Sequence, residues 1–299
     1  MKNSATLRYL FALFLYGTIG FFLHFVSYSS EFVVLGRGVL GSLFIFLVLS
    51  LRKEKIDMAA IRKNLRILLL SGFALGFNWV FLFAGYRYGI AISSLCNYMA
   101  PIAVVIITTL VYKEKIRPIQ IVFILMAVLG MFLLIGIFSA DVKADMHCVI
   151  YGSLAALGFV VLVLCNKRLT DIKPLEKTLV QLLASAVIVF PYVVFKQGFP
   201  VSFDLRSTLI VLLLGFVHTG VAYICYFSSI DVLPSQSIAI LGYLEPVLNF
   251  VIGALVFHEP LGISSLIGAA MILCASLGNE LIGNKINENI FRKKMKNNR

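Results

Sequence analysis

Ten apolar stretches of about 20–23 residues run through this chain of 299 residues and limit what it can fold into. A helix needs about 20 apolar residues to cross the ~30 Å hydrocarbon layer of a bilayer. The stretches are continuous rather than alternating, which argues against an outer-membrane β-barrel. We therefore predict an all-α polytopic membrane protein with ten transmembrane helices. These spans are expected at 7–26, 32–51, 65–86, 90–112, 119–138, 147–166, 177–196, 207–227, 236–257 and 261–282.

The composition agrees with this prediction. Residues of the AVILMFWYC set make up 60% of the chain, only 13% are charged, and the mean hydropathy is +0.97. These values exclude a soluble globular enzyme, a disordered chain and a secreted disulfide scaffold. The first stretch is too long for the apolar core of a signal peptide, so we expect it to be retained as a helix.

The cysteines and histidines form no recognisable site. The five cysteines have no CxxC spacing, and the four histidines form neither HxxxH nor HExxH. We expect no metal site, no disulfide framework and no cofactor. No GxxxxGK[ST] phosphate-binding loop occurs in the sequence.

The net charge of +12 would suit nucleic acid, but the positions of the charges indicate a topology signal. With the N-terminus inside, 21 of the 26 Lys and Arg residues fall in inside segments. Only Arg87, Lys143, Lys196 and Arg206 fall outside, and Arg37 lies within a span. Positive residues favour the cytoplasmic side, so we expect a cell-membrane protein with both termini in the cytoplasm. Its partners are then the lipid bilayer and a small solute rather than nucleic acid, and the basic tail 283–299 is solvated.

The two halves of the chain resemble each other. An offset of 145 residues places Tyr98-Met-Ala-Pro101 on Tyr243-Leu-Glu-Pro246 and Glu114 on Glu259, and an offset of 144 places Trp79 on Tyr223. The repeated unit would hold five spans, over 1–138 and 147–282. Because this unit crosses the membrane an odd number of times, the second copy enters the membrane in the opposite orientation. Such inverted repeats are typical of secondary transporters, whose site lies near the midplane.

The duplicated motifs, Tyr98-x-x-Pro101 with Glu114 and Leu244-Glu245-Pro246 with Glu259, resemble the EamA-type branch of the drug/metabolite transporter superfamily. The resemblance covers essentially the whole chain. It implies a ten-helix inverted-repeat transporter of small metabolites, often amino acids or related compounds, frequently an exporter. It also implies a central cavity lined mainly by helices 1–4 and 6–9. The substrate itself does not carry over, because one fold serves many solutes.

Pro101 and Pro246 are expected inside the fourth and ninth spans. A proline has no N–H, so the carbonyls of Asn97 and Gly242 lose their helical partners. Within a membrane, those carbonyls need a neighbour, a water molecule or a ligand. We predict hinges beside the cavity, with a static packed kink as the alternative.

Glu245 and Arg37 are the acid and the base expected within spans. Ionisable groups there face the protein interior or water and often mark function. Glu245 would bind a proton or a cationic group of the solute, or else accept a hydrogen bond or pair with Arg37. Arg37 would hold an anionic group of the solute, or else pair with an acid, meet helix-end carbonyls or extend to the interface.

Other polar residues are weaker candidates. His24 and His218 would act as proton switches or as packed, hydrogen-bonded residues. Glu114 and Glu259 are best explained as helix-end anchors near Pro118 and Pro260. Tyr16 and Gln181 are further, weaker cavity candidates.

A pocket that stacks on the apolar body of a solute and hydrogen-bonds its polar ends would use Asn78, Trp79, Asn97, Tyr98, Tyr223, Tyr226, Tyr243 and Asn249.

We therefore predict a secondary transporter that works by alternating access, with Glu245, His24 and His218 as the candidates for proton coupling. An integral-membrane enzyme is one alternative, but the short loops hold no cluster of nucleophile, acid or metal ligands. A membrane interaction module without transport activity is the other.

Overall fold

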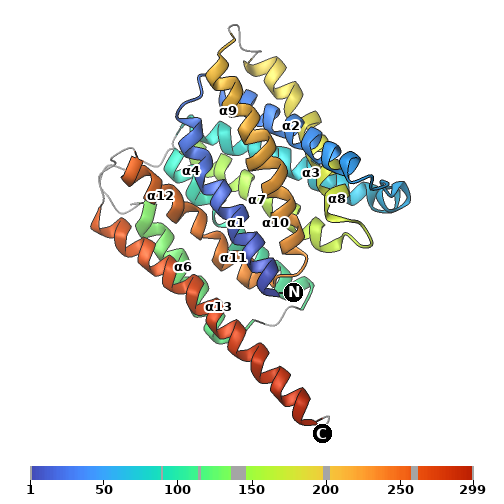
Figure 1. The fold of residues 1–299 in the computed structure, drawn as a ribbon. Helices are drawn as coiled ribbons and strands as arrows, with labels where there is room; N and C mark the ends of the chain where they lie inside the picture. The colour runs from blue at the N-terminus through green and yellow to red at the C-terminus, as the bar shows by residue number, and fades with distance from the viewer. Residues whose placement is uncertain are drawn as a thin grey trace.

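The computed structural model describes residues 2–88, 90–113, 116–135, 146–197, 203–256 and 262–297, and every regular element in these ranges is a helix. Nine of the described segments are long and apolar enough to cross a bilayer, and Ile263–Asn279 is a shorter apolar helix. This arrangement confirms the all-α, ten-span prediction (Figure 1).

We number the spans in chain order. Six are single helices: spans 1, 2, 3, 5, 6 and 10 are α1 (Lys2–Leu23), α2 (Ser30–Leu51), α3 (Met58–Tyr86), α6 (Pro118–Ile135), α7 (Met146–Arg168) and α13 (Ile263–Asn297). The other four contain more than one element. Span 4 is formed by α4 (Ile90–Asn97) and α5 (Ala100–Val111), and span 7 by α8 (Pro174–Tyr192) with η1 (Val193–Gln197). Span 8 is formed by α9 (Leu205–Gly215), η2 (Phe216–Val221) and α10 (Ala222–Ile230), and span 9 by α11 (Ser235–Gly242) and α12 (Leu244–Val256).

The third span begins earlier than its hydropathy indicates. It was expected at 65–86, but α3 starts at Met58. Charged residues in the first two turns lower the hydropathy without preventing a helix, since Lys and Arg are good helix formers. The side chain of Asp57 accepts hydrogen bonds from the backbone N–H groups of Ala59 and Ala60, both at 3.0 Å, and so caps the helix.

Spans 4 and 9 are broken at equivalent places. Helix α4 ends at Asn97 and α5 begins at Ala100, while α11 ends at Gly242 and α12 begins at Leu244. Pro101 occupies the first turn of α5, where its missing N–H is tolerated. The expected disturbance by the two prolines is therefore a break in each helix rather than a gentle bend.

Two other spans contain π-helical segments. Segment η2 lies in the middle of span 8, and η1 ends span 7 just after Pro191. Such segments insert one extra residue and are frequent at functional sites. Asp204 lies directly before span 8, where it caps α9 and accepts hydrogen bonds from the side chain and backbone of Ser207. These bonds lower the pKa of Asp204 below its ordinary value.

The two halves pack with opposite orientations. Helices α2 and α8 run antiparallel, since positions later in α2 face positions earlier in α8. A Cβ on Gly38 would meet Ala186, and one on Gly41 would meet Leu182. The start of α2 therefore lies near the end of α8, at the opposite end of the bundle from the start of α8. In both halves, the second span packs against elements of the other half.

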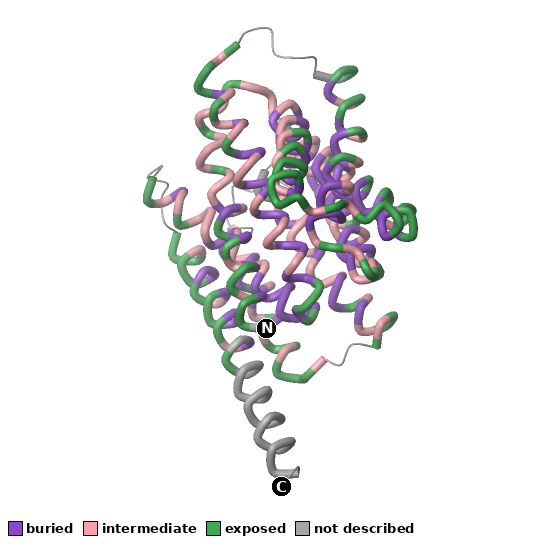
Figure 2. Tube along the Cα trace, turned by 45° about the vertical axis from the view of Figure 1, so that its right-hand side comes forward, coloured by how far each residue is buried: buried purple, intermediate pink, exposed green. Residues whose placement is uncertain are grey.

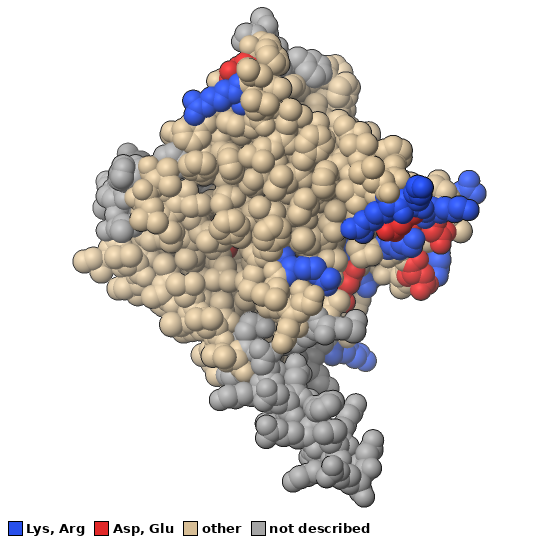
Figure 3. All heavy atoms as spheres, viewed as in Figure 1, with Lys and Arg blue, Asp and Glu red and all other residues tan. Residues whose placement is uncertain are grey.

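The surface has the character of a membrane protein. Buried residues follow the centre of the bundle in Figure 2, whereas exposed residues face outward along the helices. The broad face in Figure 3 is almost free of charge, and charged side chains gather toward its edges. Large apolar side chains such as Leu110, Leu125 and Leu255 are exposed on this surface, as contact with lipid tails requires.

Close packing of spans 5 and 10 leads to a stability prediction. A Cβ on Gly268 would overlap the carbonyl oxygen of Gly130 and the backbone nitrogen of Leu134, neither of which can move alone. We expect Gly268→Ala to lower the free energy of unfolding by about 1–3 kcal/mol, the usual cost of overpacking. The matched control is Gly262→Ala, whose Cβ would meet nothing closer than 3.6 Å. Thermal unfolding in detergent measures both, and equal melting temperatures would contradict the prediction.

Candidate functional site

A cavity of about 740 Å³ lies at the centre of the bundle. The residues that line it come from spans 1–6, 8 and 9. The resemblance implied lining by helices 1–4 and 6–9. The structure differs in two respects: α8 contributes no lining residue, and α6 contributes Met131, Leu134 and Ile135.

Two helices present regular faces to the cavity. The lining residues of α1 include Tyr9, Leu13, Tyr16 and Gly20, which recur every three or four positions and so share one face. Helix α3 does the same from Leu75 to Tyr86. Helical periodicity thus explains which side chains of these spans reach the interior.

Arg37 is the cation among the described lining residues. Its Nε donates a hydrogen bond to Thr219 Oγ1 at 3.0 Å, and its guanidinium lies 5.5 Å from the ring centre of Trp79. The Thr219 hydroxyl in turn donates to the carbonyl of Leu214 at 2.9 Å within the π-helical region. The side chain is buried and forms no ion pair with a described acid, so it neither extends to the interface nor pairs with Glu245.

The orientation of Arg37 matters chemically. The Nε edge of the guanidinium is held by Thr219, and its Cζ lies over the ring of Trp79 at 5.5 Å from the ring centre. The terminal Nη atoms make no hydrogen bond to any residue in the described parts of the chain, and the residue borders the cavity. A guanidinium held in this way offers a fork of donors that matches a carboxylate or phosphate.

Glu245 is the acid among the described lining residues, and it lies where the two broken spans meet. Its Oε1 accepts a hydrogen bond from the Tyr98 hydroxyl at 3.1 Å. The Tyr243 hydroxyl donates to the carbonyl of Tyr98 at 2.9 Å. Tyr98 and Tyr243 stand 145 residues apart, the offset between the repeats, so equivalent break points are bonded to each other.

Asn78 connects three helices beside the cavity. Its Nδ2 donates to Asn97 Oδ1 at 2.9 Å and to the carbonyl of Ala155 at 2.8 Å, which ties α3 to α4 and α7. Asn97 borders the cavity next to it, and Asn249 borders it from α12. Buried amides with satisfied bonds hold a wall in one geometry.

Aromatic rings form one wall of the cavity. Ring centres lie 5.6 Å apart for Tyr16 and Tyr223, 6.0 Å for Trp79 and Tyr223, and 5.5 Å for Tyr9 and Tyr226. The hydroxyls of Tyr16 and Tyr226 have no hydrogen-bond partner among the described residues. Rings of this kind offer flat apolar contact together with polar tips.

Several predicted residues do not border the cavity. Tyr243 is buried behind the wall, where its hydroxyl reaches Tyr98. His24 is exposed just after α1. His218 is buried in η2, with its Nε2 3.0 Å from Thr18 Oγ1. Gln181 lies in α8, where its Nε2 donates to Ser71 Oγ at 2.7 Å.

The remaining predicted residues all border one space. Asn78, Trp79, Asn97, Tyr98, Tyr223, Tyr226, Asn249, Arg37, Glu245, Pro101 and Pro246 line the cavity, as does Tyr16. Glu114 and Glu259 lie outside the described residues. Within the described part of the chain, no group of three or more His, Cys, Asp or Glu is arranged to hold a metal ion.

Four polar lining residues were not predicted from the sequence. Tyr9, Tyr86, Ser94 and Ser235 border the cavity, and Ser94 Oγ donates to the Tyr86 hydroxyl at 3.3 Å. The spacing of the two tyrosines held a usable signal: Tyr9 precedes Tyr16 by two helical turns, and Tyr86 follows Trp79 by two turns.

Comparison with known proteins gives consistent results. Two transporters of Bacillus subtilis (strain 168) are similar in sequence, both described as uncharacterized. YxxF is 28% identical over 255 residues, which cover 84% of this chain and 81% of that protein. YojE is 27% identical over 235 residues, which cover 75% and 76%. A solved crystal structure has the same fold, with a TM-score of 0.83 and 17% identity over 96% of this chain and 99% of that one.

The family model for EamA-like transporters matches the chain twice, at residues 4–136 and 146–279. The two matches correspond to the two inverted five-helix halves. The finer limits of 1–138, 147–282 and the tail 283–299 remain predictions. The cavity is enclosed by both halves, as expected for a solute site between inverted repeats. The chain belongs to the EamA-like transporter family and is a multi-pass membrane transporter.

Proposed function

We propose that this protein exports a small zwitterionic metabolite, such as an amino acid or a related compound, across the cell membrane by alternating access. The observation that carries the proposal is that a fixed cation and an acid line the same aromatic cavity without pairing with each other. Arg37 and Glu245 are its charged lining residues among those described. The direction of transport is the one that the family resemblance implies.

Each part of a zwitterion has a partner in the cavity. The free Nη atoms of Arg37 suit a carboxylate, which a guanidinium binds through two parallel hydrogen bonds. Glu245 suits an ammonium group, because a carboxylate accepts hydrogen bonds from its N–H donors. The rings of Trp79 and Tyr223 supply apolar contact for the body of the solute.

Energy for net transport would come from a solute or proton gradient, because the sequence carries no phosphate-binding loop. Glu245 is the group we propose for proton binding, since a carboxylate inside a membrane protein is costly unless it has such a function. His24 and His218 do not border the cavity and are less suited to that role. We further propose that both termini lie in the cytoplasm, on the charge distribution given above.

Transport of an unmodified zwitterion by purified protein in liposomes tests the function. We expect a labelled neutral amino acid to cross, whereas its decarboxylated amine and its N-acetylated form do not. Arg37→Gln should slow flux about tenfold or more, since a hydrogen bond to a charged group contributes about 1.5–3 kcal/mol.

The matched control for that experiment is Arg206→Gln, which removes an arginine that stacks on Phe25 and does not border the cavity. Equal passage of all three compounds, or a chemically altered product, would contradict the proposal. So would an Arg37→Gln variant as fast as the wild type.

Substitution of Glu245 tests proton coupling. Glu245→Gln keeps the shape of the side chain but cannot ionise, so we expect the pH dependence of flux to flatten. Tyr98→Phe is the control, because it removes the hydrogen bond at 3.1 Å and leaves the carboxylate in place. Flux measured across a series of external pH values distinguishes the two. A Glu245→Gln profile that matches the wild type would reject proton binding at this residue.

Substitution of the hinge prolines tests the role of the broken spans. Pro101→Ala and Pro246→Ala restore an N–H that can bond the carbonyl four residues earlier and straighten the helix. We expect the maximal flux to fall several-fold while the apparent solute affinity and melting temperature stay near those of the wild type. Pro118→Ala is the control, since Pro118 begins α6 and does not lie between two helices of one broken span. Unchanged flux in both hinge variants would favour static kinks.

A further inference from the structure

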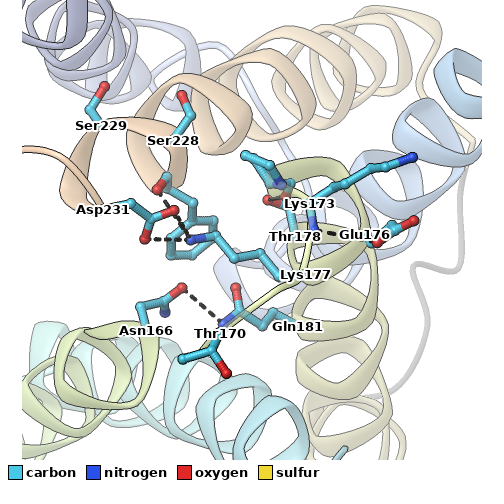
Figure 4. Close-up of polar contacts among 12 residues, drawn as sticks. Asn166, Thr170, Lys173, Glu176, Lys177, Thr178, Gln181, Ser228, Ser229 and Asp231 are labelled. Atoms are coloured by element: carbon cyan, nitrogen blue, oxygen red, sulfur yellow. Dashed lines mark hydrogen bonds and ion pairs between the residues drawn. The ribbon is translucent and has the colours of Figure 1, made fainter. Parts of the chain in front are cut away.

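Two ion pairs tie equivalent helices together at opposite ends of the bundle. In the first repeat, Arg87, just after α3, pairs with Glu31 in the first turn of α2. In the second repeat, Asp231, just after α10, pairs with Lys177 in the first turn of α8, at 2.6 Å (Figure 4).

The pairs occupy corresponding places with their charges exchanged. Lys177 follows Glu31 by 146 positions (177 − 31) and Asp231 follows Arg87 by 144 (231 − 87), close to the offset of 145 between Tyr98 and Tyr243. An acid at the start of span 2 is replaced by a base at the start of span 7. The base after span 3 is replaced by an acid after span 8.

Burial follows the same correspondence. The member at the helix start is buried in each pair, with side-chain exposures of 6% for Glu31 and 2% for Lys177. The member after the helix end is partly exposed, at 49% for Arg87 and 38% for Asp231. Lys177 also donates to the carbonyl of Phe227 at 3.3 Å, which places its ammonium against the end of α10.

Each pair includes or contacts a residue that is adjacent in the chain to a lining residue of the cavity. Tyr86, next to Arg87, borders the cavity, and so does Tyr226, next to the Phe227 that Lys177 contacts. Helices α2 and α3 otherwise contact each other little, as do α8 and α10. The pairs therefore supply direct links between helices that are mainly held together through other spans.

Their places at opposite ends follow from the antiparallel packing of α2 and α8 described above. Both pairs are formed in this structure. Alternating access requires each end of the bundle to open in turn while the other stays closed.

We propose that the two ion pairs are latches of opposite polarity, with Glu31–Arg87 closing the outer end of the cavity and Lys177–Asp231 closing the inner end. This inference rests on the alternating access proposed above. Removal of one member of an ion pair leaves the buried charge less well compensated, and opening of that end relieves it by admitting water. Loss of the exposed partner therefore favours the state in which that end is open.

Accessibility of a cavity cysteine tests the latches without any solute. The reporter is Ser94→Cys, a small change on the cavity wall, in a background without the five native cysteines. A membrane-impermeant thiol reagent is applied to right-side-out or inside-out vesicles. A second reporter, Lys53→Cys in the loop after α2, establishes which side of the vesicle is exposed.

We expect Arg87→Gln to raise the labelling rate about tenfold from outside, and Asp231→Asn to raise it about tenfold from inside. The exchanged pairs, Glu31→Arg with Arg87→Glu and Lys177→Asp with Asp231→Lys, should return the rates to those of the parent. Arg87→Lys and Asp231→Glu keep the charges and should hold parent rates. These charge-conserving variants test the same dependence on charge if an exchanged pair does not fold.

The proposal is overturned if both single variants raise labelling from the same side or if neither changes it. It is also overturned if the folded charge-conserving variants label as fast as Arg87→Gln and Asp231→Asn. Because the readout is accessibility rather than flux, a wrong solute class leaves this result intact. Failure of alternating access itself would appear as rates from the two sides that never change in opposite directions.

Discussion

The structure depends on how two interrupted helices satisfy their backbone inside a membrane. A carbonyl freed in hydrocarbon has no water to bind, so an interrupted span is tolerated only where protein or a wet cavity supplies a partner. Here the Tyr243 hydroxyl bonds the carbonyl of Tyr98, and the Tyr98 hydroxyl bonds Glu245. The two breaks thus stabilise each other, and the polar groups required for this stand at the edge of the cavity.

The two repeats together form the cavity, and the residues that differ between the repeats provide its charged groups. The charged lining residues come from different halves and have no charged counterparts. The position equivalent to Glu245 is Ala100, a buried residue in an apolar cluster with Val104, Val160 and Val163. Arg37 is held by Thr219 from the other half and by Trp79 from its own. A solute between them would contact both halves at once, as a rocking mechanism requires.

Much of this arrangement could be predicted from hydropathy, charge and internal repetition. These patterns report on single helices and their order, so they indicated ten spans, the inversion and most of the polar lining residues. They could not show which polar residues meet across spans. Lys177 counted only as one of the inside charges, but it is buried and paired with Asp231 from another span. The early start of α3 was not predicted, since the charged residues in its first two turns lower the hydropathy of a segment that is still helical. The place of His218 behind Thr18 depends on packing that no local pattern records.

The π-helical segment η2 has a consequence for how cavities of this type diverge. One extra residue in a turn rotates everything that follows by about 100° relative to an unbroken α-helix. Tyr223 and Tyr226 lie directly beyond η2, and their aim toward the interior depends on that added rotation. Removal of one residue from the segment would let the span wind as a plain α-helix while it swung both rings toward neighbouring helices. Evolution could in this way exchange the solute-facing side of a span in a single deletion, with its length and lipid contacts almost unchanged.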